Sequence, residues 1–273
     1  IILFGVNLSD EIIRAAAKTR LVQLLAAGYD RINTDLLFQL NIPCANNGGA
    51  NSRAVAEHAV MLMLVLYKQL LTLDRSTRDG RWRDLLDGRT TFEMAGKLVG
   101  ILGMGNIGQR VATLLRGFEV EVQYYDKCLL PSSREKELNV RNVCVDKLFQ
   151  SSDVVSCHTA LTSATWHIVS RERIAMMNRS SVLINTSRGP VVDERALIDA
   201  LSQNLIAGAS LDVFEEEPVD PNNPLLKMNN VVVTPHSAGT TWDTWSRRAE
   251  FAYNNIKRVS EGELPLAAVS DDI

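Results

Sequence analysis

Residues 99–108 read VGILGMGNIG, an apolar run that ends in three glycines, and this feature constrains the fold more than any other. The spacing Gly103-x-Gly105-x-x-Gly108 allows a tight turn, an approach of bare backbone to a phosphate, and close packing of a helix on a strand. Such a pattern alone is a weak signal, because glycine turns are common. Here it follows the strand-like segment KLVGIL and opens a helix-like segment, so it predicts a phosphate cradle.

A second signal stands at the end of the next strand-like segment, VEVQYYD. Asp126 follows Gly108 by 18 residues, close to the ~20-residue interval of dinucleotide-binding folds. The N–H groups of Asn106 and Ile107 at the helix start are expected to face the anion. A carboxylate at this place accepts both ribose hydroxyls and repels a 2′-phosphate, so we expect NAD rather than NADP. The alternative is that Asp126 is a strand-end turn residue before Pro131.

Strand-like and helix-like segments alternate through most of the 273 residues, a pattern typical of parallel sheets covered by helices. We therefore expect an α/β fold with a Rossmann dinucleotide-binding domain at about 55–250 and a smaller domain made of 1–54 and 251–273. One long apolar helix, Ser52 to Leu73, is expected to join them, followed by a basic and polar stretch from Asp74 to Arg89.

Composition and patterning argue against several kinds of partner. The formal net charge is −3 and basic residues form no stripe, so we expect no nucleic acid. The longest apolar run, residues 59–67, is far shorter than the ~20 residues of a spanning helix, so we expect no membrane partner. The four cysteines lack CxxC spacing, which predicts reduced thiols in a cytoplasm, without disulfides or a metal site.

Three later strand-like segments each end in a charged or titratable residue. Arg188 follows SVLINTS, Asp212 and three glutamates follow the next segment, and His236 follows VVVTP. Because ligands of open α/β sheets bind at the carboxyl ends of strands, these residues are candidates for chemistry. Plainer interpretations are a surface arginine, a solvated acidic loop and a histidine that caps a helix. The pattern indicates hydride chemistry or dinucleotide sensing.

Several motifs occur together in one order: AAGYDRIN, PCANNGGANSRAVAEHA, DGRW, GMGNIG, HTALT, NTSRGPVVDERAL, LDVFEEEP and TPHSAG. In these motifs the chain resembles the D-isomer-specific 2-hydroxyacid dehydrogenase family over nearly its whole length. The resemblance implies a Rossmann domain with a smaller flavodoxin-like α/β substrate domain, NAD as the cofactor, and interconversion of a 2-oxo acid and a D-2-hydroxy acid. It also implies a homodimer, and the apolar helix from Val55 to Leu66 favours such a two-fold dimer.

The same resemblance implies roles for individual residues. Arg188 corresponds to the arginine that clamps the substrate, His236 to the histidine that exchanges the proton, and Glu217 to the glutamate that orients it. The substrate carboxylate is expected at the backbone N–H groups of Ala27 and Gly28. Further cofactor contacts are expected from Thr159, Thr186, Ser187, Asp212 and Gly239.

The chain also departs from the family pattern. Ala59 stands where relatives often have threonine and Ala160 where they usually have proline, which we expect to loosen cofactor binding slightly. Relatives usually carry a further strand–helix–strand unit before the segment matching IILFG, so we expect a substrate domain that lacks its first unit. Glu217 argues against the related formate dehydrogenases, which have glutamine there. An NAD(H)-sensing scaffold with little turnover, like the corepressors of the family, is the alternative function.

Overall fold

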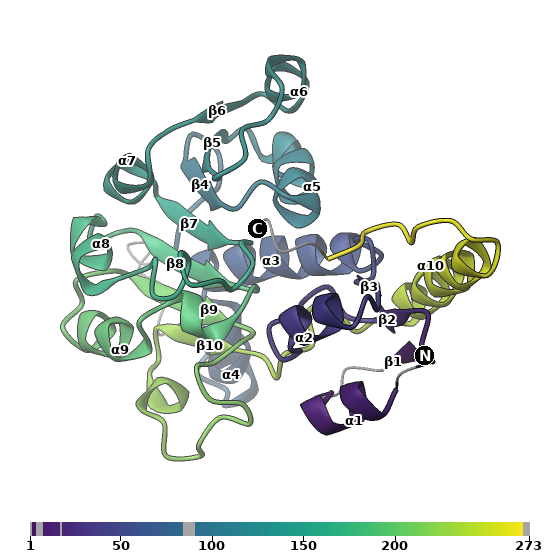
Figure 1. Cartoon of the computed structure of the whole chain (residues 1–273). Coiled ribbons are helices and arrows are strands. Elements are labelled where there is room, and N and C mark those ends of the chain that lie inside the picture. The colour runs from purple at the N-terminus through teal and green to yellow at the C-terminus, as the bar shows by residue number, and fades with distance from the viewer. Residues whose placement is uncertain (1, 4–7, 17, 84–90, 270–273) are drawn as a thin grey trace. The chain divides into compact units, whose positions relative to one another are not determined.

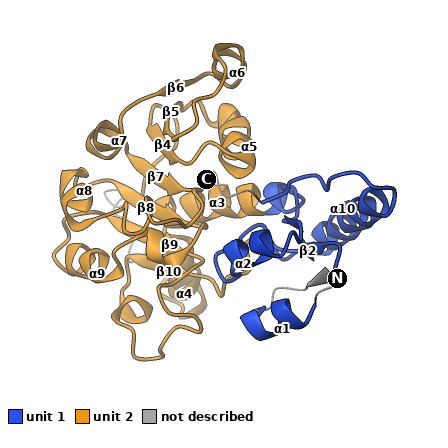
Figure 2. Cartoon of the chain, in the orientation of Figure 1, with its two compact units in different colours: residues 1–54, 239–273 blue, residues 55–238 orange. Residues whose placement is uncertain are grey.

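The computed structural model describes residues 2–3, 8–16, 18–83 and 91–269 (Figure 1). The chain forms two compact units (Figure 2). The larger is Val55–Ala238, and the smaller combines Ile1–Ala54 with Gly239–Ile273.

The second boundary between the units lies at 238/239, not near residue 250 as the sequence suggested. The last helix, α10 (Trp242–Ser260), belongs as a whole to the smaller unit. Its Asn255 Nδ2 donates a hydrogen bond of 2.7 Å to Oε1 of Gln23 on β2 (Val22–Leu24), and both side chains are fully buried. A buried amide pair of this kind fixes the helix to the strand, because neither group can turn to water.

A parallel sheet of seven described strands forms the larger unit, in the order β10-β9-β8-β7-β4-β5-β6. The order reverses between β4 and β7, and the crevice outside the carboxyl ends of strands at such a point is where open α/β sheets bind ligands. The strands are β4 (Leu98–Leu102), β5 (Glu121–Tyr125), β6 (Val140–Asn142), β7 (Val154–Cys157), β8 (Val182–Asn185), β9 (Gly208–Leu211) and β10 (Val231–Val233).

Helices cover both faces of this sheet, as Figure 1 shows. Neighbouring strand residues point to opposite faces: Val154 packs in a core with α3 and α5, and Val155 in a second core with α7, α8 and α9. The helices are α3 (Ser52–Tyr67), α4 (Leu70–Arg78), α5 (Asn106–Leu115), α6 (Ser132–Leu138), α7 (Val145–Ser151), α8 (Arg171–Met176) and α9 (Glu194–Ser202), with single 3-10 turns at Arg116–Phe118, Gly189–Val191 and Pro224–Lys227.

The smaller unit contains a second parallel sheet, in the order β1-β2-β3, with its own apolar core around Ile13, Leu24 and Leu37. Of the first expected strand, residues 1–6, only β1 is described, and the rest lies outside the described residues. The remaining elements are β1 (Ile2–Leu3), α1 (Asp10–Ala15), α2 (Thr34–Gln39) and β3 (Cys44–Ala45).

The prediction of a single helix over Ser52–Leu73 is wrong, because the structure has two helices there. Gln69 adopts a left-handed conformation with φ of 50°, and α3 and α4 meet at an angle of 59°. Residues 84–89 of the expected polar stretch lie outside the described residues. Among the helices described, none alone is long and apolar enough to cross a membrane. The bent pair of α3 and α4 together is long and apolar enough to span a membrane by length and composition alone, but Leu62 and Met63 of α3 are fully buried in the core.

Candidate active site

The glycine turn lies at the carboxyl end of β4. Gly103 has φ of 97°, and a Cβ there would lie 2.6 Å from the backbone N of Thr159. A Cβ at Gly108 would collide with the carbonyl oxygen of Gly103, whereas one at Gly105 would meet no atom within 4 Å. The turn is therefore closed where it packs against the protein and open at its centre, as a pyrophosphate cradle requires.

Asp126 and the start of α5 complete this cradle. Gly105 is the N-cap of α5 and brings no capping side chain, so the N–H groups of Asn106 and Ile107 are available to an anion. Asp126 Oδ2 accepts a hydrogen bond of 2.6 Å from the backbone N of Met104, within the glycine turn. Each carboxylate oxygen has a second lone pair, with which it can accept a ribose hydroxyl.

The residues after β8 are held by side chains of the sheet itself. Ser187 donates from N and Oγ to Asn185 Oδ1, over 3.0 and 2.8 Å. Thr186 Oγ1 lies 3.4 Å from Nδ1 of His158, whose Nε2 lies 2.8 Å from Ser156 Oγ. Burial lowers the pKa of His158 to about 3, so this histidine is neutral and ties the end of β7 to the end of β8.

Arg188 follows Ser187 at the same rim of the sheet. Its carbonyl oxygen accepts a hydrogen bond of 2.9 Å from Asn185 Nδ2, and its Nη1 donates to the carbonyl of Ser187 over 2.8 Å. Asn185, only 1% exposed, thus binds both sides of the turn that carries the guanidinium. Asn185 was not among the residues expected from the sequence, although a polar residue at the end of an apolar strand just before Arg188 is a usable signal.

Glu217 and His236 form a hydrogen-bonded pair in the loops after β9 and β10. His236 Nδ1 lies 2.8 Å from Glu217 Oε2, and Glu217 Oε1 accepts a second hydrogen bond from the backbone N of Phe214 over 3.2 Å. An ionised carboxylate only accepts hydrogen bonds, so Nδ1 carries the hydrogen and Nε2 is the nitrogen that can exchange a proton. The His236 side chain is 44% exposed, which leaves it accessible to a substrate.

Asp212 directly follows β9 and is 1% exposed. Its carbonyl oxygen accepts a hydrogen bond of 2.7 Å from the backbone N of His236. Its carboxylate accepts from the backbone N of Ser237 and of Ala238, each over 2.9 Å. The structure therefore brings Asp212 to the turn that carries the imidazole.

Ala27, Gly28 and Gly239 belong to the smaller unit, whereas the residues described above belong to the larger one. Ala27 and Gly28 follow the carboxyl end of β2, where the carbonyl of Ala27 accepts a hydrogen bond of 3.2 Å from Asn46 Nδ2. The carbonyl of Gly239 accepts one of 2.9 Å from Arg248 Nη2. Their contacts with substrate or cofactor stay predictions.

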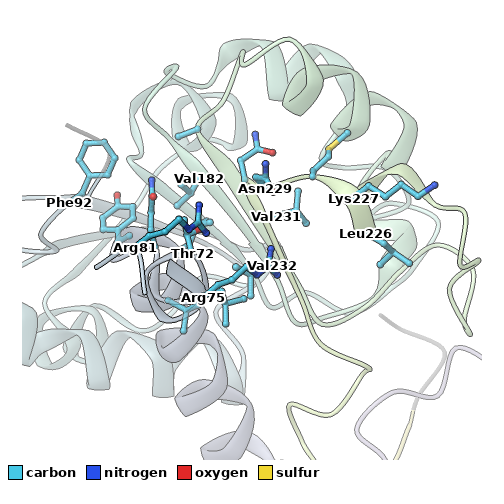
Figure 3. A pocket seen from close by; sticks show the side chains of 18 residues that line it. Thr72, Arg75, Arg81, Phe92, Val182, Leu226, Lys227, Asn229, Val231 and Val232 are labelled. Atoms are coloured by element: carbon cyan, nitrogen blue, oxygen red, sulfur yellow. The ribbon is translucent and has the colours of Figure 1, made fainter. Parts of the chain in front are cut away.

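The larger unit also has a hollow of about 730 Å³ away from this rim (Figure 3). Val182 and Val231, which begin β8 and β10, line it together with residues of α3 and α4, so it lies at the amino ends of these strands. Its lining includes Arg75, Arg81 and Lys227 and none of the acidic residues that the structure describes. Because the candidate site residues stand at the carboxyl ends, the hollow is separate from them.

Other reactive groups are dispersed over the molecule. In the part of the chain that the structure describes, no three His, Cys, Asp or Glu side chains are close enough to hold a metal ion. The four cysteines carry free thiols, and burial raises the pKa of Cys157 to about 12. That thiol is protonated and sits in the core.

Known proteins resemble the chain along almost its full length. The model of the D-isomer specific 2-hydroxyacid dehydrogenase NAD-binding domain matches residues 60–238. A glyoxylate reductase of Korarchaeum cryptofilum is 38% identical over 265 residues, which are 96% of this chain and 80% of that protein. The solved glyoxylate reductase of Paecilomyes thermophila has a TM-score of 0.88 at 31% identity, over 96% of this chain and 79% of that one. The holo D-mandelate dehydrogenase of Rhodotorula graminis has a TM-score of 0.91 at 27% identity, over 97% and 79%.

Proposed function

We propose that this chain, which belongs to the D-isomer-specific 2-hydroxyacid dehydrogenase family and depends on NAD, reduces a small 2-oxo acid such as glyoxylate. Family membership makes it a 2-hydroxyacid dehydrogenase, and the identity of the acid and of the residues that act on it is the proposal. The observation that carries it is the 2.8 Å contact between His236 Nδ1 and Glu217 Oε2. Two relatives named above are glyoxylate reductases, which supports a small substrate.

The proposed chemistry divides between the cofactor and the side chains. Bound NADH supplies a hydride. His236 donates the proton on Nε2 to the carbonyl oxygen of the substrate as negative charge develops there, and in the reverse direction the same nitrogen accepts it. Glu217 holds the ring by Nδ1 and stabilises its charged form. Arg188 offers a planar pair of donors that fits the substrate carboxylate.

The cofactor would be held by backbone and by few side chains. The open centre of the glycine turn and the first N–H groups of α5 fit the pyrophosphate, and Asp126 fits the adenosine ribose. The charge of Asp126 favours NAD over NADP. We assign further contacts to Thr159, Thr186, Ser187, Asp212 and Gly239.

A panel of 2-oxo acids of graded size tests the proposal. NADH oxidation is measured with glyoxylate, hydroxypyruvate, pyruvate and phenylglyoxylate, and NADH binding is measured separately by fluorescence. We expect turnover with at least one of them, and with glyoxylate faster than with phenylglyoxylate. Tight NADH binding without turnover on any acid would contradict the proposal and indicate the sensing scaffold, which the enzymatic relatives do not favour.

We further propose a cytoplasmic homodimer. Met61 of α3 and Leu70 and Leu71 of α4 expose 42, 52 and 55% of their surface, and Leu71 also lines the hollow of Figure 3. Exposed apolar side chains are typical of subunit interfaces. Light scattering decides the point, since a monomer at micromolar concentration would contradict it.

A further inference from the structure

We propose that His58 is a positioning residue for the reaction: it fixes the turn that carries His236, acting through Thr234 and Asp212. The inference rests on the proposed function, in which His236 exchanges the proton. His58 lies in the middle of α3, away from the strand ends that carry the candidate catalytic residues in the sequence. The geometry nevertheless links it to the proton donor by three consecutive contacts.

The turn at His236 needs support from its surroundings. His236 has φ of 51°, a left-handed conformation that is unfavourable for a residue other than glycine and persists only where neighbours enforce it. The backbone N of His236, Ser237 and Ala238 all donate to Asp212, over 2.7, 2.9 and 2.9 Å. One buried residue therefore holds the strained turn on both sides of the imidazole.

The carboxylate of Asp212 in turn needs donors, because it is 1% exposed and a buried charge without them is very unfavourable. Besides the two backbone N–H groups, the hydroxyl of Thr234 donates to Oδ1 over 2.5 Å. His58 Nε2 lies 3.7 Å from the same oxygen. The orientation of Asp212 thus depends on Thr234 and on the imidazole behind it.

The inventory of hydrogens fixes the direction of this chain. A hydroxyl has one hydrogen, and Thr234 gives it to Asp212. Thr234 Oγ1 must then accept from His58 Nε2, which lies 3.1 Å away. Nε2 of His58 therefore carries a hydrogen, and His58 donates to Thr234, which donates to Asp212. Without this donor the hydroxyl can turn its hydrogen away from the carboxylate.

Loss of the donor is expected to affect the proton transfer more than the cofactor affinity. The carboxylate would lose the hydrogen bond from Thr234, its bonds to the backbone N of Ser237 and Ala238 would weaken, and the turn at His236 would relax. A displacement of about 1 Å in an active site lowers rates up to ~10²-fold. The glycine turn and α5 are made by other elements, so the proposed pyrophosphate site stays intact, and NADH affinity can fall only through the proposed contact of Asp212.

Two substitutions of His58 form the test, one that keeps a hydrogen-bond donor and one that does not. Gln places an amide N–H near the position of Nε2, whereas Met has a similar length and no donor. We expect His58→Gln to keep kcat within about threefold and His58→Met to lower it ~10- to 100-fold, with a loss of NADH affinity of about fivefold at most. The solvent deuterium isotope effect on kcat should rise in His58→Met alone, because misaligned proton transfer becomes the slower step.

Hydrogen exchange supplies a readout that needs no activity. The amides of Ser237 and Ala238 should exchange faster in His58→Met than in His58→Gln. Thr234→Val should reproduce the loss, and combining it with His58→Met should add little, as expected for one chain. This second variant also decides the case in which His58→Met does not fold.

Two results would overturn the inference. Unchanged kcat and unchanged amide protection in His58→Met would show that His58 only packs. Equal loss in His58→Gln and His58→Met, with normal thermal unfolding, would show that the donor is not what matters. If the unaltered protein turns over no 2-oxo acid, the proposed function fails, while the exchange measurement still decides the role of His58.

Discussion

The two ends of the candidate site are built from different materials. At the β4–α5 turn the groups that would meet the cofactor are backbone N–H groups and glycines. At the ends of β8, β9 and β10 they are side chains, Arg188, Glu217 and His236, and each is held by hydrogen bonds to neighbouring residues. We therefore expect substitutions that add atoms to impair the β4–α5 turn, and substitutions that remove a polar group to impair the ends of β8, β9 and β10.

The largest effect is expected at the side-chain end. His236→Gln should lower kcat by ~10²- to 10⁴-fold, the range that a general acid contributes. NADH affinity should stay within about twofold, because the glycine turn is untouched. Steady-state rates and a fluorescence titration of NADH measure the two quantities. A rate within tenfold of the unaltered enzyme would show that another group supplies the proton.

A matched pair of substitutions tests the backbone end. Gly108→Ala forces a Cβ onto the carbonyl oxygen of Gly103, so the free energy of unfolding should fall by about 1–3 kcal/mol. Gly105→Ala adds the same atom where nothing lies within 4 Å, so stability should change by less than about 0.5 kcal/mol while NADH binding weakens. Urea unfolding and NADH titration separate the outcomes. Equal free energies of unfolding for the two variants would contradict the description of the turn as tightly packed at Gly108 and open at Gly105.

Asp126 combines the two kinds of group, because its side-chain carboxylate accepts a hydrogen bond from the backbone of the glycine turn. Asp126→Ala should narrow the preference for NAD over NADP about tenfold, which corresponds to ~1.4 kcal/mol. The measurement is the ratio of kcat/KM for the two cofactors, with Asp220→Ala, a surface carboxylate of the same unit, as control. An unchanged ratio would place the discrimination in other residues.

The smallest effect concerns pH and the neutral His158 between β7 and β8. Its pKa is lowered by burial to about 3, so below pH ~6.5 the unfolded chain binds a proton that the folded chain does not. Stability is therefore lost as the pH falls from ~6.5, by at most about 1.4 kcal/mol per pH unit. In urea unfolding between pH 7 and pH 5, His158→Gln should remove this part of the decrease in the free energy of unfolding with falling pH. Parallel slopes would show that the buried imidazole does not titrate on unfolding.

Local signals made most of the larger unit predictable. The apolar strand β4, the glycines and the amphipathic α5 lie together in the sequence, and each favours the structure that forms. The missed elements lack such signals: α6 reads SSREKEL and β6 reads VRN, without apolar periodicity. The break at Gln69 was also hidden, because glutamine is a good helix former and no residue type favouring a left-handed conformation stands there.

The site divides in the same way. Motifs pointed to Arg188, Glu217 and His236, and the structure pairs the last two. The support from Thr234 was not predictable, because its partner Asp212 is set by which strands lie side by side and not by spacing along the chain. Asn185, in contrast, binds Arg188 only three residues away, so its place at the end of an apolar strand was a local signal.

The pairing of β9 with β10 decides where this protein can change in length. Leu211 lies opposite Val233, which brings Asp212 beside Thr234 at the next step. A single residue inserted in either strand would shift that step by ~3.3 Å and turn the following side chains to the other face, breaking the hydrogen bond between Thr234 and Asp212. The exposed stretch 220–222 between the strands has no partner register to keep. Evolutionary insertions, or an engineered peptide tag, belong there.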